Sequence, residues 1–432
     1  MKIQPARNLH GTINLPGDKS ISHRAALFSA MANGTTRIEN FATSADCAST
    51  LSCLQQLGVE ISRENSSVSV KGVGKIGFKG AESPLDCGNS GTTMRLLSGI
   101  LAGQRFDSVL IGDESLSIRP MKRVIEPLSQ MNARIEATEN HAPLRIFGKN
   151  PLRAISFEPK VASAQVKSCL ILAGLNADGK TSVLEKTPTR DHTERMLRWF
   201  GVDVEESSTE NGKLISVSGD ANLTARDLLV PSDVSSAAFF LVAAACLTGS
   251  EIVLQAVGLN PTRNAIVEVL RAFGAEIEVF SEREIGNEPI GDLRVRRNGD
   301  LRSKLSSNIL RGKIIANLID EIPILAVFGT QIEGGIEIRE ASELRVKESD
   351  RIRSVVENLR KMNARVEEFE DGFRVEKSQL KGARVESFGD HRIAMAFAVA
   401  ALFADSETEI EDAECAAVSF PAFFEILQSV TK

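Results

Sequence analysis

Residues 15–24 read LPGDKSISHR, and the remainder of the chain repeats the pattern that they begin. Pro16–Gly17 interrupt a short apolar run, so we expect a turn there. Ser20 or Ser22 can cap the helix that follows, and its apolar residues continue as far as Met31. The stretch therefore predicts a turn followed by a buried helix.

The first residues of this helix are rich in hydrogen-bond donors and positive charge. Lys19 and Arg24 lie near the free amides and the positive end of the helix dipole, which already favour an anion. An ordinary capped helix with solvated charges is the alternative interpretation of one such stretch. The recurrence of the pattern along the chain favours an anion site.

Small-residue-rich apolar helices of this kind recur six times, and an extended segment follows each of them. Their apolar character on all sides predicts that they are buried inside each domain. The residues expected to close them are Gly34, Gly103, Gly179, Gly249, Gly335 and Asp405.

Amphipathic helices alternate with the apolar ones and share one way of ending. Each stops at glycine or asparagine, which accept the left-handed conformation of a helix C-terminus. A short strand, a polar turn and a second strand follow each of them. The chain is therefore predicted to be an α/β protein built from six repeats of about 70 residues. The expected terminating residues are Gly58, Asn132, Gly201, Gly274 and Asn363.

The composition is typical of a soluble globular protein with more than one domain: 432 residues, 42% hydrophobic and 25% charged. A formal net charge of −6, with 5% aromatic residues and no tyrosine, argues against nucleic acid or an anionic membrane as the main partner. Six scattered cysteines without a C-x-x-C pair indicate buried thiols in a reducing compartment. Since the sequence shows neither a signal-peptide pattern nor a membrane-spanning apolar run, we expect a cytoplasmic protein.

The segments that open the six apolar helices are unusually polar or rich in glycine. A helix N-cap accounts for one serine or aspartate in each segment, but not for the recurring lysine and arginine. If these ends point one way, they form a binding site for a polyanion. The segments are GDKSISHR (17–24), CGNSGTT (87–93), ASAQ (162–165), PSDVSS (231–236), DEIP (320–323) and GDHR (389–392).

Further charge comes from Arg119, Arg190 and the run LRVKESDR at 344–351. On a helix, Lys347 and Arg351 would share one face with Glu348 beside them. A solvated helix face with intrahelical ion pairs is the alternative interpretation of this run. No histidine or cysteine spacing is typical of a metal site, so no metal is predicted.

These motifs together resemble the 5-enolpyruvylshikimate-3-phosphate (EPSP) synthase family, the enolpyruvyl transferases of the shikimate pathway. The resemblance covers essentially the whole chain. Its motifs GDKSISHR, SAQVKS and TRDHTE are similar to the second of the family's two main sequence classes. The motifs that carry it are, in order, LPGDKSISHR, GNSGTTMR, SIRPMKR, SAQVKS, TRDHTE, IDEIP, LRVKESDR and GDHRIAM.

The resemblance implies an α/β fold of two domains, each of three βαββαβ units arranged as an inside-out α/β barrel. The chain would pass between the domains twice. The implied N-terminal domain spans residues 17–231. The C-terminal domain would comprise residues 232–432 and be completed by the N-terminal strand within residues 1–16.

The implied reaction transfers the enolpyruvyl group of phosphoenolpyruvate to the 5-hydroxyl of shikimate-3-phosphate and releases phosphate. It belongs to aromatic amino-acid biosynthesis and needs neither a cofactor nor a metal. Two substrates with two phosphates and two carboxylates require a cationic site with groups that move protons. We expect a monomer that acts on these small molecules, without nucleic acid or membrane.

The resemblance also implies roles for individual residues. Asp320 would be the base at the 5-hydroxyl and Glu348 the proton shuttle at the methylene carbon, with Lys19 as a further catalytic group. The implied shikimate-3-phosphate ligands are Lys19, Ser20, Arg24, Ser163, Ala164, Gln165, Arg190, Asp320 and Lys347. The implied phosphoenolpyruvate ligands are Lys19, Gly91, Arg119, Gln165, Arg351 and Arg392.

The sequence departs from the family pattern at two positions. Val418 stands where many members have a lysine, so one anion contact is lost or supplied by another group. Leu96 stands where many members have proline.

Two other functions remain as alternatives. One is the sister transferase that acts on UDP-N-acetylglucosamine, which is expected to have a lysine-asparagine pair near the start, whereas Ser20 follows Lys19 here. The other is an RNA-end-processing protein of related fold, which the net charge and the scarcity of aromatic residues disfavour.

Overall fold

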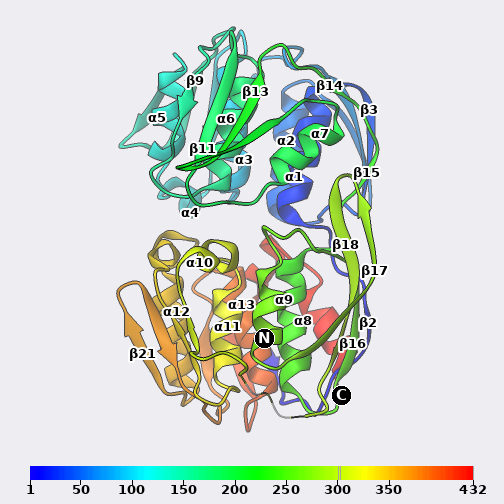
Figure 1. Cartoon of the computed structure of the whole chain (residues 1–432), viewed down its shortest axis with the longest axis vertical. Coiled ribbons are helices and arrows are strands. Elements are labelled where there is room, and N and C mark those ends of the chain that lie inside the picture. The colour runs from blue at the N-terminus through cyan, green and yellow to red at the C-terminus, as the bar shows by residue number, and fades with distance from the viewer. Residues whose placement is uncertain (300, 302, 432) are drawn as a thin grey trace. The chain divides into compact units, whose positions relative to one another are not determined.

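A computed structural model describes residues 1–299, 301 and 303–431 of the chain. Its internal contacts divide the chain into two compact units (Figure 1). Unit 1 comprises Met1–Pro16, Pro231–Arg283 and Pro289–Lys432, and unit 2 comprises Gly17–Val230 and Glu284–Glu288. Among the described helices, none combines the length and the apolar character that crossing a bilayer requires.

Unit 2 has its apolar helices in the interior and its sheets around them (Figure 1). Its apolar helices are α1 (Lys19–Met31), α3 (Gly91–Ala102) and α6 (Ala164–Gly174). Nearly every residue of α1 after Ser20 is buried, which fits a helix that is apolar on all sides. The amphipathic helices are α2 (Ala45–Gln56), α5 (Lys122–Gln130) and α7 (His192–Trp199), and α4 (Glu114–Ser117) is a single turn.

Each sheet in the described part of unit 2 has the same plan. A short strand pairs in parallel with the strand that follows an apolar helix, and that strand pairs with an antiparallel hairpin. The strands in sheet order are β14 (Leu223–Thr224) and β15 (Leu228–Leu229), β3 (Ala32–Glu39), β5 (Ser67–Val73) and β4 (Glu60–Glu64); β6 (Leu85–Asp86), β7 (Ser108–Ile111), β9 (His141–Phe147) and β8 (Arg134–Thr138); and β10 (Ser156–Phe157), β11 (Lys180–Glu185), β13 (Gly212–Ser218) and β12 (Glu205–Thr209).

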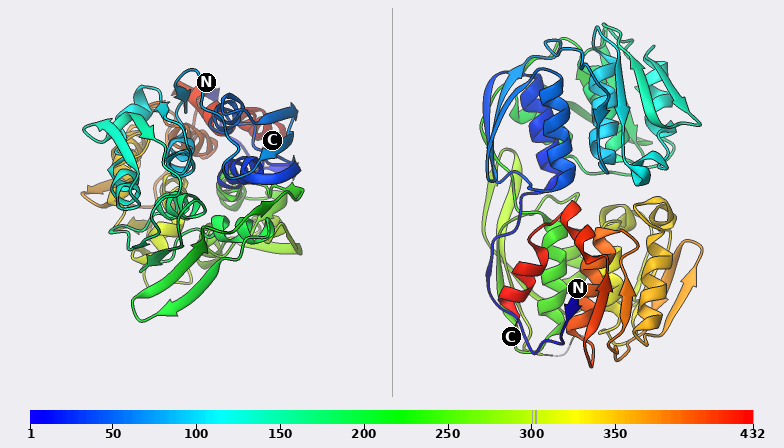
Figure 2. Two further views of the ribbon diagram at one scale, coloured as in Figure 1. Left: turned by 90° about the horizontal axis from the view of Figure 1, so that it is seen from above. Right: turned by 180° about the vertical axis from the view of Figure 1, so that it is seen from behind.

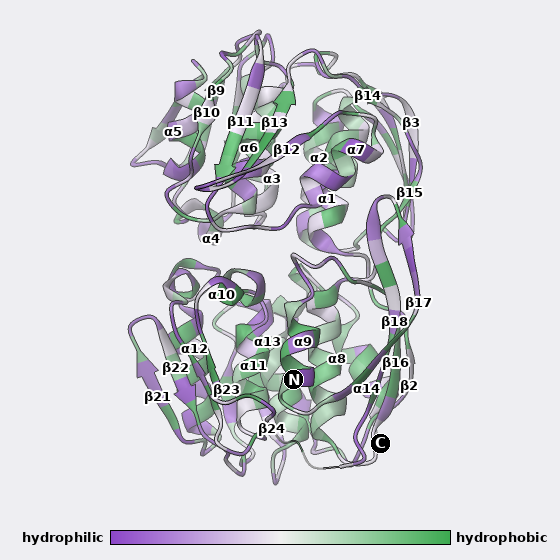
Figure 3. Cartoon of the chain, viewed as in Figure 1, coloured by the Kyte–Doolittle hydropathy of each residue, from purple (hydrophilic) through white to green (hydrophobic). Residues whose placement is uncertain are grey.

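Unit 1 repeats this arrangement with its own helices. Its apolar helices are α8 (Val234–Cys246), α11 (Ile322–Gly329) and α13 (His391–Leu402), which Figure 3 colours largely as hydrophobic. The remaining helical segments are α9 (Ala265–Ala272), α10 (Lys313–Leu318), α12 (Arg351–Lys361) and α14 (Phe423–Val430), with the 3₁₀ turns η1 (Ser342–Val346) and η2 (Ala413–Val418). Both the N-terminal strand and helix α14 belong to this unit (Figure 2).

The sheets of unit 1 use the same strand order as those of unit 2, except that one ends in the N-terminal strand. In that sheet β1 pairs antiparallel with β24 and takes the place of a hairpin. The strands in sheet order are β17 (Glu276–Ile285), β18 (Glu288–Arg296), β16 (Glu251–Gly258) and β2 (His10–Ile13); β19 (Ile309–Leu310), β20 (Ile336–Ile338), β22 (Gly372–Val375) and β21 (Val366–Phe369); and β1 (Lys2–Ile3), β24 (Thr408–Glu411) and β23 (Arg384–Glu386).

Three strands show where the chain passes from one unit to the other. Strand β2 comes directly before α1 of unit 2, yet it pairs with β16 of unit 1. Strands β14 and β15 come before α8 of unit 1, yet they pair with β3 of unit 2. The chain therefore contributes its last strand to the sheet of one unit and then enters the other unit. These boundaries lie at Pro16–Gly17 and Val230–Pro231.

The predicted ends of the amphipathic helices are confirmed. All five terminating residues have positive φ, as an α-helix that ends in a left-handed residue requires. Their values are 85° at Gly58, 66° at Asn132, 84° at Gly201, 94° at Gly274 and 64° at Asn363.

Some local predictions are wrong. Neither Ser20 nor Ser22 caps α1: Asp18 does, with its side chain accepting the Ile21 N–H at 2.8 Å, and Ser22 Oγ accepts the Ala42 N–H instead. Gly34 does not close that helix, because Ala32 is already extended and the chain continues directly into β3.

The run at 344–351 is also not one helix. It consists of η1, a connection and the start of α12, whose N-cap is Asp350. Lys347 has an extended ψ of −149° and accordingly cannot continue η1 into α12. The predicted helix face with Lys347, Glu348 and Arg351 therefore does not exist.

Helices α3 and α6 approach each other closely at Gly99. A Cβ added there would lie 2.2 Å from the carbonyl oxygen of Cys169 on α6, so only glycine fits without a shift of the backbone. We expect Gly99→Ala to destabilise unit 2 by about 1–3 kcal/mol, the usual cost of overpacking. Trp199, the only tryptophan of the chain, lies on α7 of this unit, and its fluorescence in urea measures the loss.

The matched control is Gly179→Ala, whose new Cβ would meet the Ala154 Cβ at an ordinary 3.5 Å. The control should unfold at the urea concentration of the wild type. An unchanged midpoint for Gly99→Ala would mean that the two helices can separate without cost.

Candidate functional site

The candidate ligands of unit 2 gather at the N-termini of its apolar helices. Lys19 and Ser20 begin α1, Gly91 begins α3, and Ala164 and Gln165 begin α6. Ser90 and Ser163 cap the latter two helices by accepting N–H bonds from Thr93 and Val166. These helix starts therefore present backbone donors and positive dipole ends beside the side chains.

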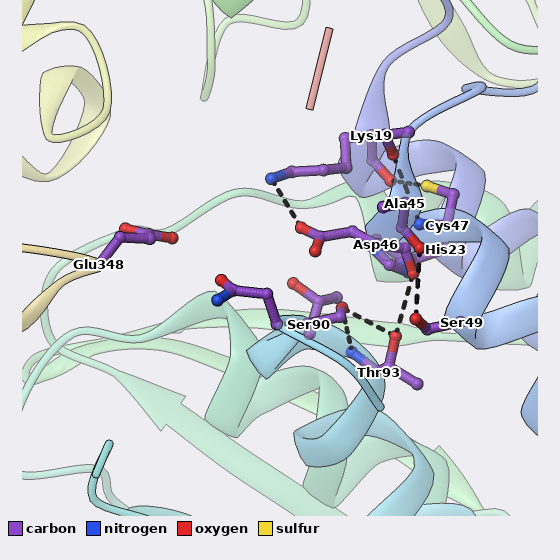
Figure 4. Close-up of polar contacts among 12 residues, drawn as sticks. Lys19, His23, Ala45, Asp46, Cys47, Ser49, Ser90, Thr93 and Glu348 are labelled. Carbon is purple, nitrogen blue, oxygen red and sulfur yellow. Dashed lines mark hydrogen bonds and ion pairs between the residues drawn. The ribbon is translucent and has the colours of Figure 1, made fainter. Parts of the chain in front are cut away.

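Lys19 is held by a carboxylate from α2. Its Nζ lies 2.9 Å from Asp46 Oδ2, and the two side chains are 20% and 10% exposed (Figure 4). The adjoining starts of α2 and α3 are joined by a hydroxyl pair, Thr50 Oγ1 and Thr93 Oγ1, at 2.6 Å. The position of the ammonium is thus fixed before any ligand arrives.

Arg24 is buried and bonded through each of its nitrogens. Nε donates to Thr193 Oγ1 at 2.8 Å, Nη2 to Ser168 Oγ at 2.7 Å and Nη1 to the Ser20 carbonyl at 2.9 Å. Burial lowers the pKa of Arg24 to about 10, so the guanidinium stays charged at neutral pH. Neutral hydroxyls orient the cation without cancelling its charge.

The local field of these cations acts on a neighbouring histidine. Burial lowers the pKa of His23 well below its ordinary value, and the charges of Lys19 and Arg24 lower it further. His23 is consequently neutral at physiological pH. Its Nδ1 lies 2.7 Å from Thr50 Oγ1, within the same hydroxyl chain.

The remaining candidate ligands of unit 2 are oriented by polar partners. Arg95 Nη1 donates to Gln165 Oε1 at 2.6 Å, and Gln165 Nε2 donates to Thr92 Oγ1 at 3.0 Å, which joins α3 to α6. Arg119 Nη2 donates to Asn89 Oδ1 at 2.7 Å, beside the start of α3. Arg190 directly precedes Asp191, the N-cap residue of α7.

Unit 2 also contains a buried ion cluster of Lys167, Glu185 and Glu194, which the sequence analysis did not identify. Lys167 Nζ is 2.6 Å from Glu194 Oε1 and 3.1 Å from Glu185 Oε1. All three side chains are at most 5% exposed. Burial raises the pKa of Glu194, and the ammonium of Lys167 opposes that rise only in part. Lys167 is therefore the main group that favours the charged form of this carboxyl.

Unit 1 places its candidate catalytic carboxylates on one guanidinium. Arg351, with a side chain 1% exposed, has Nη2 2.6 Å from Glu348 Oε2 and Nη1 3.5 Å from Asp320 Oδ1. The Asp320 carbonyl accepts Arg392 Nη1 at 2.9 Å, and Arg392 Nε lies 3.8 Å from Asp320 Oδ1. The four residues thus form one contiguous group.

Asp390 connects the segments of this group. Its carboxylate accepts Arg351 Nε at 2.8 Å, Ser349 Oγ at 3.1 Å and the Arg392 N–H at 2.9 Å. Burial would lower the pKa of Arg351, but Asp390, Glu348 and Asp320 outweigh it and raise that pKa. Burial would likewise raise the pKa of Asp390, but Arg351 outweighs it, so the pair stays ionised.

Asp320 is not a helix cap. The N-cap position of α11 is Glu321, and no side chain accepts a hydrogen bond there. Lys347 lies in the connection after η1, where its Nζ is 3.2 Å from Glu343 Oε1. Neither Asp320 nor Lys347 is therefore the N-cap residue of a helix.

Several residues that build the two groups were missed by sequence reasoning. Four of them each hold a candidate ligand that is distant in the sequence, which is why local patterns did not reveal them. They are Asp46, Ser168, Thr193 and Asp390. A buried serine or threonine inside an apolar helix, such as Ser168, is the one available signal, because its hydroxyl needs a partner.

Within the described residues, no group of three or more His, Cys, Asp or Glu side chains could hold a metal ion. Chemically, unit 2 offers fixed cations and helix N-termini that suit phosphates and carboxylates. Unit 1 offers carboxyl groups beside two guanidinium groups, which suits proton transfer next to an anion.

Comparison with known proteins agrees with this chemistry. Residues 3–427 match the family model described as EPSP synthase (3-phosphoshikimate 1-carboxyvinyltransferase). The 3-phosphoshikimate 1-carboxyvinyltransferases of Koribacter versatilis and Salinibacter ruber are each 51% identical to this chain, over 100% and 99% of it and 99% of their own lengths. The solved structure of EPSP synthase from Acinetobacter baumannii is 43% identical, with a TM-score of 0.88, and covers 100% of this chain and 98% of its own. The six-repeat α/β fold expected from the sequence is therefore confirmed, and the chain belongs to the EPSP synthase (3-phosphoshikimate 1-carboxyvinyltransferase) family.

Proposed function

We propose that this chain transfers the enolpyruvyl group of phosphoenolpyruvate to the 5-hydroxyl of shikimate-3-phosphate and releases phosphate. The observation that carries the proposal is the group in unit 1 where Asp320 and Glu348 lie against the guanidinium of Arg351. The reaction moves protons at two centres, and two carboxyl groups beside one cation can serve both. Family membership supports the same reaction.

In this proposal the ligands of shikimate-3-phosphate are the residues that the family resemblance implies. From unit 2, Lys19, Ser20 and Arg24 supply cations and a hydroxyl, and Ser163, Ala164 and Gln165 supply the start of α6. Arg190 precedes α7, while Asp320 and Lys347 come from unit 1. The neutral hydroxyl partners of Arg24 support its role, because they leave its positive charge to a phosphate.

Phosphoenolpyruvate is proposed to bind Lys19, Gly91, Arg119 and Gln165 of unit 2 and Arg351 and Arg392 of unit 1. The helix start at Gly91 offers backbone donors, and Arg119 is already oriented by Asn89. In unit 1, Arg351 already lies against Glu348 and Asp320, so its contact with the substrate would share a cation engaged by carboxylates.

The proposed steps use these residues in order. Asp320, as a carboxylate, takes the proton of the 5-hydroxyl as its oxygen adds to C2 of phosphoenolpyruvate, and Glu348, in its protonated form, gives its own proton to the methylene carbon. Phosphate then leaves and takes up the proton held by Asp320, and Glu348 takes back a proton from the methyl group to restore the double bond. Lys19 is the further catalytic group, a cation beside the charge that develops on the departing phosphate.

We also propose that the two compact units are the two domains expected at residues 17–231 and at 1–16 with 232–432. We propose a cytoplasmic location, since the cysteines are free thiols and most of them are buried, as a reducing compartment favours. We also propose that the protein is a monomer. Sedimentation of the purified protein would measure its mass directly.

A coupled phosphate-release assay tests the proposed reaction. The wild type should release phosphate only when shikimate-3-phosphate and phosphoenolpyruvate are both present. Release with UDP-N-acetylglucosamine in place of shikimate-3-phosphate, or no release with either acceptor, would contradict the assignment.

Asp320→Asn tests the proposed base. The amide keeps the size of the side chain and cannot accept a proton, so kcat should fall by roughly 10²–10⁴-fold while substrate binding is retained. Steady-state kinetics and calorimetric titration measure the two quantities. The control Asp292→Asn changes an aspartate of β18 that accepts the Ala256 N–H, and it should turn over normally. Normal turnover by folded Asp320→Asn would remove Asp320 from the mechanism.

Glu348→Gln tests the proposed shuttle at the methylene carbon. In D₂O with both substrates, the wild type should incorporate deuterium into the methylene group of phosphoenolpyruvate, and the variant should lose this exchange because it cannot return a proton. Mass spectrometry of recovered phosphoenolpyruvate measures it. Glu357→Gln on α12, which removes only an ion pair with exposed Arg353, is the control. If Glu348→Gln exchanges at the native rate, another group is the shuttle.

A further inference from the structure

The turn between β17 and β18, which belongs to unit 2, is bonded to helix α7. Gly286 and Asn287 have φ of 59° and 62°, as in a two-residue hairpin turn. Asn287 Nδ2 donates to the Arg195 carbonyl at 3.1 Å, and the Asn287 carbonyl accepts Arg195 Nη1 at 3.0 Å. Two hydrogen bonds between the same two residues thus hold the turn on the helix.

The next residue of the hairpin makes a buried contact with the start of α7. Glu288 Oε1 lies 2.8 Å from His192 Nδ1, with side chains that are 5% and 1% exposed. Ninety-six residues separate the two in sequence. A carboxylate buried so far from water is retained only where its partner groups compensate for the lost hydration.

The first turn of α7 points three consecutive side chains at three buried partners. His192 meets Glu288, Thr193 Oγ1 accepts Arg24 Nε, and Glu194 pairs with Lys167. Successive residues of an α-helix are about 100° apart, so these contacts fix the rotation of the helix as well as its position. Arg190 lies two residues before His192 and directly before Asp191, the N-cap residue of this turn.

We propose that Glu288, acting through His192, is a positioning residue that holds the first turn of α7 and so sets the placement of Arg24 and Arg190 for the phosphorylated substrate. This inference rests on the proposed function, in which both arginines bind shikimate-3-phosphate. Glu288 itself contacts no substrate.

Glu288 also acts on Arg24 through its charge. Burial lowers the pKa of Arg24, and Glu194, Asp18 and Glu288 oppose that effect in this order of strength. Removing the Glu288 carboxylate therefore both loosens the helix and weakens the stabilisation of a buried cation. Both effects act at the shikimate-3-phosphate ligands Arg24 and Arg190.

The test measures the affinity for shikimate-3-phosphate by calorimetry, together with the kinetics of phosphate release. Glu288→Ala should weaken binding by roughly tenfold to a hundredfold, the effect of leaving a buried partner unsatisfied. The KM for phosphoenolpyruvate should change less than about threefold. Glu288→Gln keeps an oxygen for His192 and should restore most of the affinity. The double variant His192→Ala with Glu288→Ala should bind no more weakly than the weaker of the two single variants. Each single change already removes the whole His192–Glu288 contact, so the second change removes nothing further.

Glu284→Ala is the matched control, since it removes an exposed acid of the same turn and should bind normally. If Trp199 fluorescence shows that Glu288→Ala is unfolded, Asn287→Gly serves as the second variant. It keeps the turn but removes the hydrogen bond from Asn287 Nδ2 to the Arg195 carbonyl, and its affinity for shikimate-3-phosphate should be several-fold weaker. Wild-type affinity in Glu288→Ala or Asn287→Gly, or an equal loss for both substrates, overturns the positioning role. Failure of the wild type to release phosphate would instead overturn the proposed function.

Discussion

The burial of apolar helices along their whole length is the constraint on which both units depend. Helices such as α8 and α13 have almost no exposed side, so charge can be placed only at their ends. At an N-terminus the first amides have no partner within the helix and the dipole is positive. The helix starts are therefore where a chain with a net charge of −6 can bind anions.

The two units use a buried arginine in opposite ways. Arg24 is held by hydroxyls and a carbonyl, which orient the guanidinium and leave its charge for a ligand. Arg351 is held by Asp390, Glu348 and Asp320, so its charge is engaged by carboxyl groups of the protein. The first arrangement suits binding of a phosphate, and the second suits proton transfer. Removal of either arginine would leave buried polar partners unsatisfied, which is costly in a low-dielectric interior.

Local rules succeeded where one residue decides the outcome. Each of the five helices ends at the predicted Gly or Asn, because the left-handed conformation strains every side chain that carries a Cβ and few residues tolerate it. The rules failed where neighbours compete. Asp18, Ser20 and Ser22 can all cap a helix; in the structure Asp18 does so, and Ser22 accepts the Ala42 N–H instead. The charge pattern at 344–351 fits a helix, but Asp350 starts a new one and leaves Lys347 extended.

The sequence by itself determined the repeats, the buried helices and the family, because hydrophobic periodicity, terminating residues and ordered motifs are local properties. Only the tertiary structure decided which strands complete which sheet. Strand β2 pairs with β16 although α1 follows it, and no local signal distinguishes this from pairing with β3. The same holds for the partners of the candidate ligands. Asp46 on Lys19, Thr193 on Arg24 and Glu288 on His192 are 27, 169 and 96 residues away, and hydrogen bonds at such separations depend on packing that composition does not encode.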